Sequence, residues 1–226
     1  MWTHGKRSGF TLVEIAIVLV IIGLILAAVL KGQEMILNAR TRNVINDLRG
    51  VSAAYYAYLD RYYAIPGDDA AANMHFASAV IGNGDGFISG LYAASGTTLT
   101  TGGAAESEKF WQHTRMAGFL TGIATATTAS PANNALGGIL GVQSQITAAG
   151  ASTYGMTGNV VCAGSIPWKI ALAVDTTIDD GNSDTGTVRA GLNGANLATT
   201  AGTSAAYGTA AAPANTDTIH TVCMKI

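Results

Sequence analysis

The sequence predicts an α+β protein in which a long N-terminal helix packs on a small antiparallel β-sheet. Three observations predict this fold class. No proline interrupts the chain before Pro66, short apolar or alternating segments after it are typical of strands, and stretches of small residues separate those segments. We expect an apolar helix at 10–30, its amphipathic continuation at 31–65 and a globular head at 66–226.

The composition excludes several classes of protein. Hydrophobic residues make up 49% of the 226 residues, which excludes a disordered chain. Charged residues are only 12%, about half the share of an average soluble domain. Two cysteines are too few for a disulfide-dense miniprotein or a four-cysteine zinc site.

The first helix is predicted by an apolar segment. Residues 10–30 are apolar except for Thr11 and Glu14, and they contain no proline. A helix needs about 20 such residues to cross a bilayer. A buried core helix and a secretory signal peptide are the alternatives. A signal peptide has a shorter apolar stretch of about 7–15 residues, and the sequence from Lys31 continues as helix, so we favour a retained membrane helix.

Glu14 interrupts the hydrophobic pattern. An ionised carboxylate inside a bilayer costs at least about 2.5–3.5 kcal/mol. It either reaches the interface as a snorkelling side chain or is held for pairing with another chain. Cations flank both ends of the segment, with Lys6 and Arg7 before it and Lys31 and Arg40 after it, so charge alone leaves the orientation open.

The helix continues beyond the apolar segment. Its stripe has steps of three and four residues, the period of one helix face. The stripe consists of Leu37, Thr41, Val44, Leu48, Val51, Tyr55, Tyr58 and Tyr62. We interpret the tyrosines as core residues packed against the head, and Pro66-Gly67 ends the helix.

The head is predicted to contain short helices and strands. A helix is expected at 106–120, ending at Gly118 or Gly122, with His113 as a half-exposed packing residue. A second helix is expected at 165–174, capped by Ser165. Strands are expected at 139–143, 159–163, 186–190 and 219–226. Loops are expected at 93–105, 121–135 and 195–214, where small residues dominate.

The N-terminal sequence KRSGFTLVEIAIVLVIIGLILAAVL resembles the start of a type IV prepilin or type II secretion pseudopilin. The resemblance implies that residues 1–9 are a leader, that a prepilin peptidase cuts between Gly9 and Phe10, and that the new Phe10 amine is methylated. It also implies that Glu14 pairs with the Phe10 amine of a neighbouring subunit during filament assembly. Such a pair would relieve two charges in lipid together.

The resemblance also implies a cellular location and binding partners. The chain would cross the bacterial inner membrane once, with the leader in the cytoplasm and the head outside, and would then enter a pilus or pseudopilus. Its partners would be the peptidase, other pilin or pseudopilin subunits, an assembly platform and, before assembly, membrane lipid. The mature length favours a minor pilin or pseudopilin. The alternative is a membrane-tethered binding or enzymatic head that does not polymerise.

The two cysteines, Cys162 and Cys223, both lie in predicted strands. An extracytoplasmic head lies in an oxidising compartment, which favours a disulfide between them. It would close a loop of about 60 residues and contribute about 2–4 kcal/mol. A pair of buried free thiols is the other interpretation.

Two acidic loops offer oxygen ligands for calcium, which takes six to eight of them. Asn83–Ile88 lacks carboxylates at both ends of an EF-hand register, so we interpret it as a glycine turn. The second loop is richer in ligands, and a calcium site and a solvated acidic turn both fit it. Its candidate ligands are Asp175, Asp179, Asp180, Asn182 and Asp184.

Enzymatic and nucleic-acid functions are disfavoured. The sequence contains no GxSxG, HExxH, Walker or CxxC motif, so we expect no enzyme. After Gly50 it carries six Lys and Arg against eleven Asp and Glu, a net charge of −5. A head of that charge is a poor partner for phosphate.

Overall fold

The computed structural model describes residues 12–93, 99, 105–144, 153–192, 207 and 218–226. The chain divides into two units, Met1–Ala39 and Arg40–Ile226. Helix α1 (Leu12–Tyr62) supplies all the described residues of the first unit and the first element of the second. We describe the two units separately.

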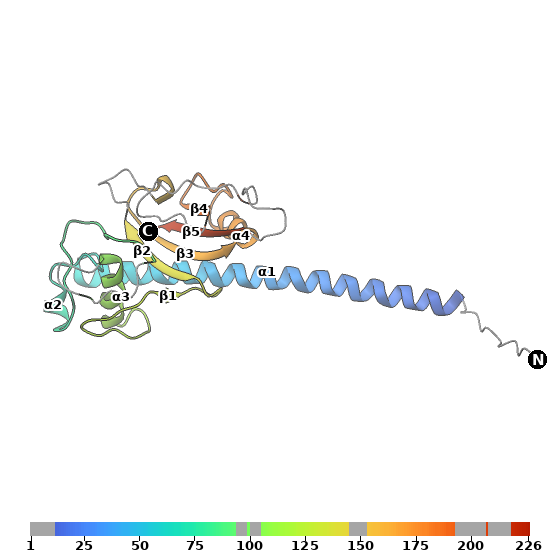
Figure 1. Cartoon of the computed structure of the whole chain (residues 1–226), viewed down its shortest axis with the longest axis horizontal. Helices are drawn as coiled ribbons and strands as arrows, with labels where there is room; N and C mark the ends of the chain where they lie inside the picture. Colours follow the sequence, from blue (N-terminus) through green and yellow to red (C-terminus); the bar gives the residue numbers. More distant parts are fainter. Residues whose placement is uncertain (1–11, 94–98, 100–104, 145–152, 193–206, 208–217) are drawn as a thin grey trace, which may run out of the picture. The chain divides into compact units, whose positions relative to one another are not determined.

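The second unit is built on a five-stranded sheet, in which every neighbouring pair is antiparallel (Figure 1). The strand order is β1-β2-β3-β5-β4. The strands are β1 (Ala132–Asn133), β2 (Ile139–Ser144), β3 (Asn159–Pro167), β4 (Val188–Leu192) and β5 (Ile219–Lys225). Four of them fall at the predicted strand segments, and the antiparallel prediction is confirmed.

In this unit α1 packs on the sheet with the predicted stripe. The buried residues of α1 are Thr41, Val44, Ile45, Leu48, Val51, Ala54, Tyr55 and Tyr58. The hydroxyl of Tyr55 accepts a hydrogen bond from Asn159 Nδ2 of β3 at 2.9 Å. The α+β fold of a long helix on an antiparallel sheet is therefore confirmed.

The C-terminal end of α1 lies three residues before the predicted boundary at residue 65. The helix ends at Tyr62, and Tyr63 adopts a left-handed φ of 54°, which is uncommon for a residue with a Cβ. Pro66, which has no backbone N–H, follows and cannot continue the helix.

The described residues of the head form three further α-helices and a short 3-10 helix, η2 (Thr153–Gly155). The α-helices are α2 (Ala72–His75), α3 (Glu106–Met116) and α4 (Trp168–Ile178). Gly118, with φ 78°, follows α3 as predicted. The predicted start of the second helix was wrong. Ser165 belongs to β3, which pairs with β5 as far as Pro167, so α4 begins only at Trp168.

The prediction for His113 was also wrong, because α3 is buried on every side from Glu106 to Thr114. Nδ1 of His113 accepts a hydrogen bond from the Gly67 N–H at 2.9 Å. The proton is therefore on Nε2, which donates to the Val80 carbonyl at 2.8 Å. Burial lowers the pKa of His113, so the ring is neutral and ties α3 to residues 67–80.

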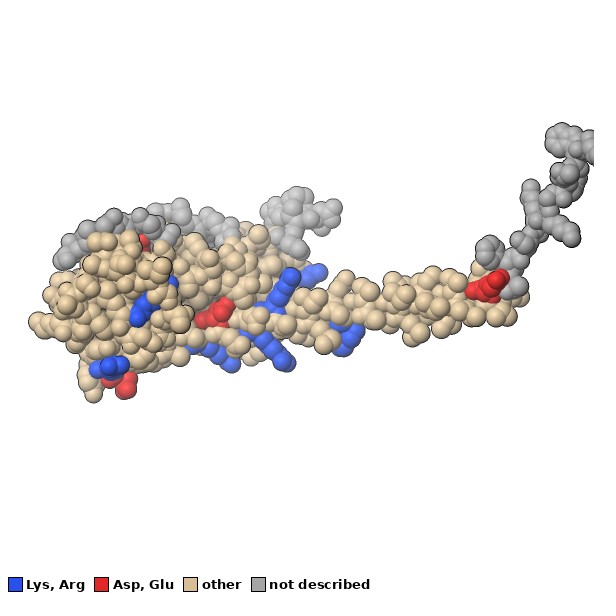
Figure 2. Space-filling model, turned by 90° about the horizontal axis from the view of Figure 1, so that it is seen from below, with Lys and Arg blue, Asp and Glu red and all other residues tan. Residues whose placement is uncertain are grey.

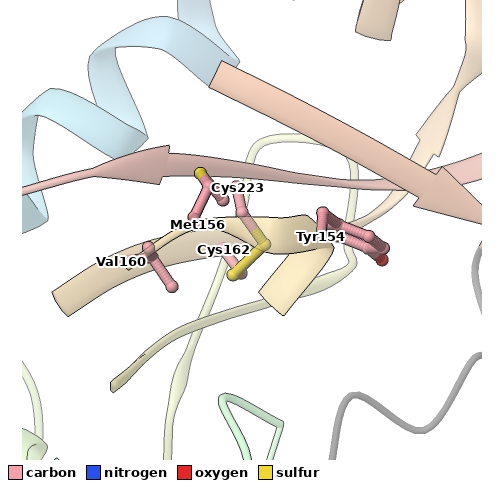
Figure 3. Packing of buried hydrophobic residues seen from close by; sticks show 5 residues of the cluster. All are labelled: Tyr154, Met156, Val160, Cys162 and Cys223. Atoms are coloured by element: carbon pink, nitrogen blue, oxygen red, sulfur yellow. A yellow bond between two sulfur atoms is a disulfide. The ribbon is translucent and has the colours of Figure 1, made fainter. Parts of the chain in front are cut away.

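The predicted disulfide is present. Cys162 of β3 and Cys223 of β5 are register partners with their Cα atoms 4.0 Å apart, and their sulfurs are bonded. Figure 3 shows the bond among the side chains of Tyr154, Met156 and Val160. Both cysteines have no exposed surface, so the bond is part of the core.

Two loop predictions fall mainly outside the described residues, at 93–105 and 195–214. The third, 121–135, is described. It is irregular except for the two residues of β1.

Candidate functional site

The first unit presents a helix whose surface is mostly apolar. The apolar window of α1 has a mean hydropathy of 3.1 and none of it is buried. Leu12 is 89% exposed and Leu24 is 67% exposed. By length and composition α1 can cross a membrane, a test that signal sequences also pass.

Glu14 lies in the first turn of this helix and is exposed. An acidic residue there suits the positive end of the helix dipole. Gly9 and Phe10 lie outside the described residues, so the leader cleavage and methylation site remains a prediction.

Gly23 leaves a gap in the apolar surface. No atom lies within 4 Å of the position that a Cβ would take there. Ala27 follows four residues later, which makes a small-x-x-x-small pair on one helix face. Such pairs allow two helix backbones to approach closely in lipid.

The head contains one acidic group that the sequence did not predict. Ligand oxygens of Asp68, Asp85 and Glu106 lie within 4.8 Å of one another. Asp68 is only 4% exposed. Its Oδ1 accepts hydrogen bonds from the N–H groups of Gly84 at 2.6 Å and Asp85 at 3.1 Å, and its Oδ2 accepts one from Gly86 at 2.8 Å.

Glu106 completes this group from the start of α3. Its two oxygens accept hydrogen bonds from the N–H groups of Asn83 at 3.1 Å and Ser89 at 2.9 Å. Burial and the charge of Glu106 raise the pKa of Asp68, while the N–H donors oppose the shift. Residues 83–89 thus form the predicted glycine turn, and it is wrapped around two carboxylates distant in sequence.

The second acidic group is the predicted one. Ligand oxygens of Asp175, Asp179 and Asp180 lie within 4.8 Å of one another, at the end of α4. Asp175 is fully buried and accepts hydrogen bonds from the Tyr207 hydroxyl at 2.7 Å and the Gly181 N–H at 3.2 Å. Burial raises its pKa, and the charges of the other two aspartates add to the shift.

The remaining predicted ligands lie farther along the same loop. Asn182 donates its backbone N–H to Asp180 and accepts one from Asp184 through its side chain. The hydroxyl of Thr185 also donates to Asp180, and these bonds lower the pKa of Asp180. The loop therefore groups three of the five predicted ligands and uses Asn182 to shape the turn. Carboxylate oxygens are ligands that suit a hard cation, so both acidic groups could bind a metal.

Sequence reasoning missed Asp68 and Glu106 because they lie 17 and 21 residues from Asp85. The available signal was Gly82. A Cβ there would lie 2.1 Å from the carbonyl carbon of Asp68, so only glycine allows the loop to pass so close. Tyr207 was missed because it stands in a stretch of small residues.

Comparison with known proteins bears on the first unit. The prokaryotic N-terminal methylation motif matches residues 4–30. This motif is the one that places an N-terminal segment with the type IV pilins and pseudopilins. Neither the curated proteins nor the solved structures contained a match to it.

The motif and the pilin-like fold suggest a structural role. The motif implies processing by a prepilin peptidase and partners in pilus assembly. The apolar helix and the motif are consistent with a membrane-anchored pilin whose head lies outside the cytoplasm.

Proposed function

We propose that the protein is a structural subunit of a type IV pilus or a type II secretion pseudopilus, acting as a minor pilin or pseudopilin. The observation that carries this proposal is the match of residues 4–30 to the methylation motif, continuous with an exposed apolar helix. A helix with that surface is stable only in lipid or against other apolar helices.

Before assembly the subunit lies in the inner membrane with its head outside the cytoplasm. A prepilin peptidase cuts between Gly9 and Phe10 and the Phe10 amine is methylated. Glu14 then pairs with the Phe10 amine of a neighbouring subunit. Lipid gives helices no hydrophobic drive to associate, so this charge pair and close packing at Gly23 favour the filament.

Mass spectrometry of the protein from its native host tests the processing. We expect a mature chain that begins at an N-methylated Phe10. A chain that keeps its first nine residues beside an active peptidase would contradict the proposal.

A Glu14 variant tests the assembly step. Glu14→Ala should insert in the membrane normally, and its incorporation into filaments should fall about tenfold or more, because the amine of its neighbour loses its partner. Glu14→Asp keeps the charge and serves as the control. Quantitative immunoblots of sheared filaments measure both. Normal entry of the alanine variant would count against the pairing.

We further propose calcium as the ion for the second acidic group, with ligands from Asp175, Asp179, Asp180, Asn182 and Asp184. Clustered carboxylates repel one another without a cation. Thermal unfolding with added Ca²⁺, and with Mg²⁺ as control, tests this proposal. A saturable rise in Tm with Ca²⁺ supports the site, and no rise would identify the loop as a solvated acidic turn.

A further inference from the structure

The second unit carries an unpaired basic surface on α1. Arg42, Asn46 and Arg49 are all exposed, and their spacing of four and three residues places them on one helix face. We call this face the basic stripe. Neither arginine has a hydrogen bond or an ion pair within the part of the chain that the structure describes.

The basic stripe points away from the sheet. Each residue of the basic stripe precedes one of the buried residues Val44, Leu48 and Val51 by two positions. Two positions correspond to about 200° around a helix, so the stripe lies on the face opposite the buried one. Figure 2 views the molecule from below, and Lys and Arg side chains stand out there along α1.

An exposed acidic surface lies elsewhere on the same unit. The acidic loop (Asp179–Thr187) joins α4 to β4, and β4 is an edge strand of the sheet. In Figure 1, β4 is drawn on the side of the sheet away from α1. Asp180 and Asp184 are exposed, and the carboxylate of Asp184 has no partner among the described residues.

We propose that the basic stripe of one subunit binds the acidic loop of a second copy of this chain. The two surfaces have opposite charge and face different directions, so one copy cannot satisfy itself. A contact between two different surfaces is heterologous. Such contacts build an open filament when the rotation from one subunit to the next does not close into a ring. This inference rests on the proposed function, because a filament supplies the copies in a fixed orientation.

The acidic head favours this occupant over another anion. Beyond Gly50 the chain has a net charge of −5, so a polyanion such as nucleic acid would be repelled by the head while it bound the stripe. Another subunit offers its acidic loop, and its own basic stripe remains available for the next copy. Opposite charges also fix which surfaces meet.

Cysteine crosslinking in the full chain tests the contact. The described residues contain no free cysteine, so Asn46→Cys and Thr185→Cys introduce one thiol on each surface. With both substitutions in one chain, a thiol-specific bifunctional crosslinker should give a ladder longer than dimers in assembled filaments. Either substitution alone should give no ladder. Crosslinking that stops at dimers, or occurs with one substitution alone, would overturn the heterologous contact.

Charge reversal tests its chemistry. Arg42→Glu with Arg49→Glu should reduce ladder formation about tenfold. Arg40→Glu with Arg61→Glu makes the same change of net charge at exposed positions outside the stripe and should leave the ladder intact. An unchanged ladder in the Arg42 and Arg49 variant would overturn the proposal.

The filaments themselves separate this inference from the proposed function. Wild-type filaments without a ladder contradict only the contact between the stripe and the loop. A wild-type protein that never enters filaments contradicts the proposed function, and the contact with it.

Discussion

At the scale of single residues, His113 couples the stability of the head to pH. Its Nδ1 accepts a hydrogen bond from a backbone N–H and its Nε2 donates to a carbonyl, so a second proton has no acceptor. The ring of Tyr58 stacks on the imidazole of His113, with the two ring centroids 5.9 Å apart. The folded state therefore binds a proton at His113 less readily than the unfolded state, whose pKa is about 6.5.

The sign of the effect follows from the lowered pKa. The contribution of His113 to stability is complete above about pH 6.5 and declines below it, by at most about 1.4 kcal/mol per pH unit. Urea unfolding between pH 7.5 and pH 5.5 measures the decline. Asp68 and Asp175 have raised pKa values and change stability in the opposite direction, so the informative quantity is the difference from His113→Gln.

His113→Gln should be less stable than wild type at pH 7.5 and should lack this part of the pH dependence. The same slope in both proteins would show that another group is responsible.

At the scale of elements, the disulfide joins the two strands at the centre of the sheet. Cys162→Ala with Cys223→Ala should lower the free energy of unfolding by about 2–4 kcal/mol, because the unfolded chain regains the freedom of a loop with a sequence separation of 61. Denaturant unfolding of wild type and variant measures the loss. Since neither cysteine is exposed, dithiothreitol should reduce the wild-type bond only as fast as the head unfolds. Rapid reduction without denaturant would argue against that burial.

The elements also show how much the sequence could predict. The stripe of α1, four of the strands and the pairing of Cys162 with Cys223 followed from periodicity and compartment, which are local or compositional properties. The predicted start of α4 was wrong because it depends on the pairing of β3 with a strand far along the chain, in which Pro167 lies opposite Ile219, 52 residues later. The burial of His113 depends on the packing of residues 67–80 over α3. The sequence pattern of α3 itself does not predict this contact.

At the scale of the whole molecule, the two units differ in what stabilises them. The second unit has its own core, in which Phe110 and Tyr58 have no exposed surface, whereas the described part of the first is helix with an exposed apolar surface. Removal of residues 1–39 should therefore leave a head that unfolds in one cooperative transition and stays in the aqueous phase.

Circular dichroism during thermal unfolding and detergent phase partition check this expectation, with the full chain as control. Partition of the shortened chain into detergent would place a membrane-binding surface on the head itself.

The cross-strand bond has a further effect on proteolysis. Any single cut between Ala163 and Val222 leaves the last strand tethered to the rest of the protein through Cys162 and Cys223. A subunit nicked by an extracellular protease would therefore keep its C-terminal piece and run as one band on a non-reducing gel. Only reduction would reveal the damage, so the subunit can be cleaved once in this region without shedding a fragment.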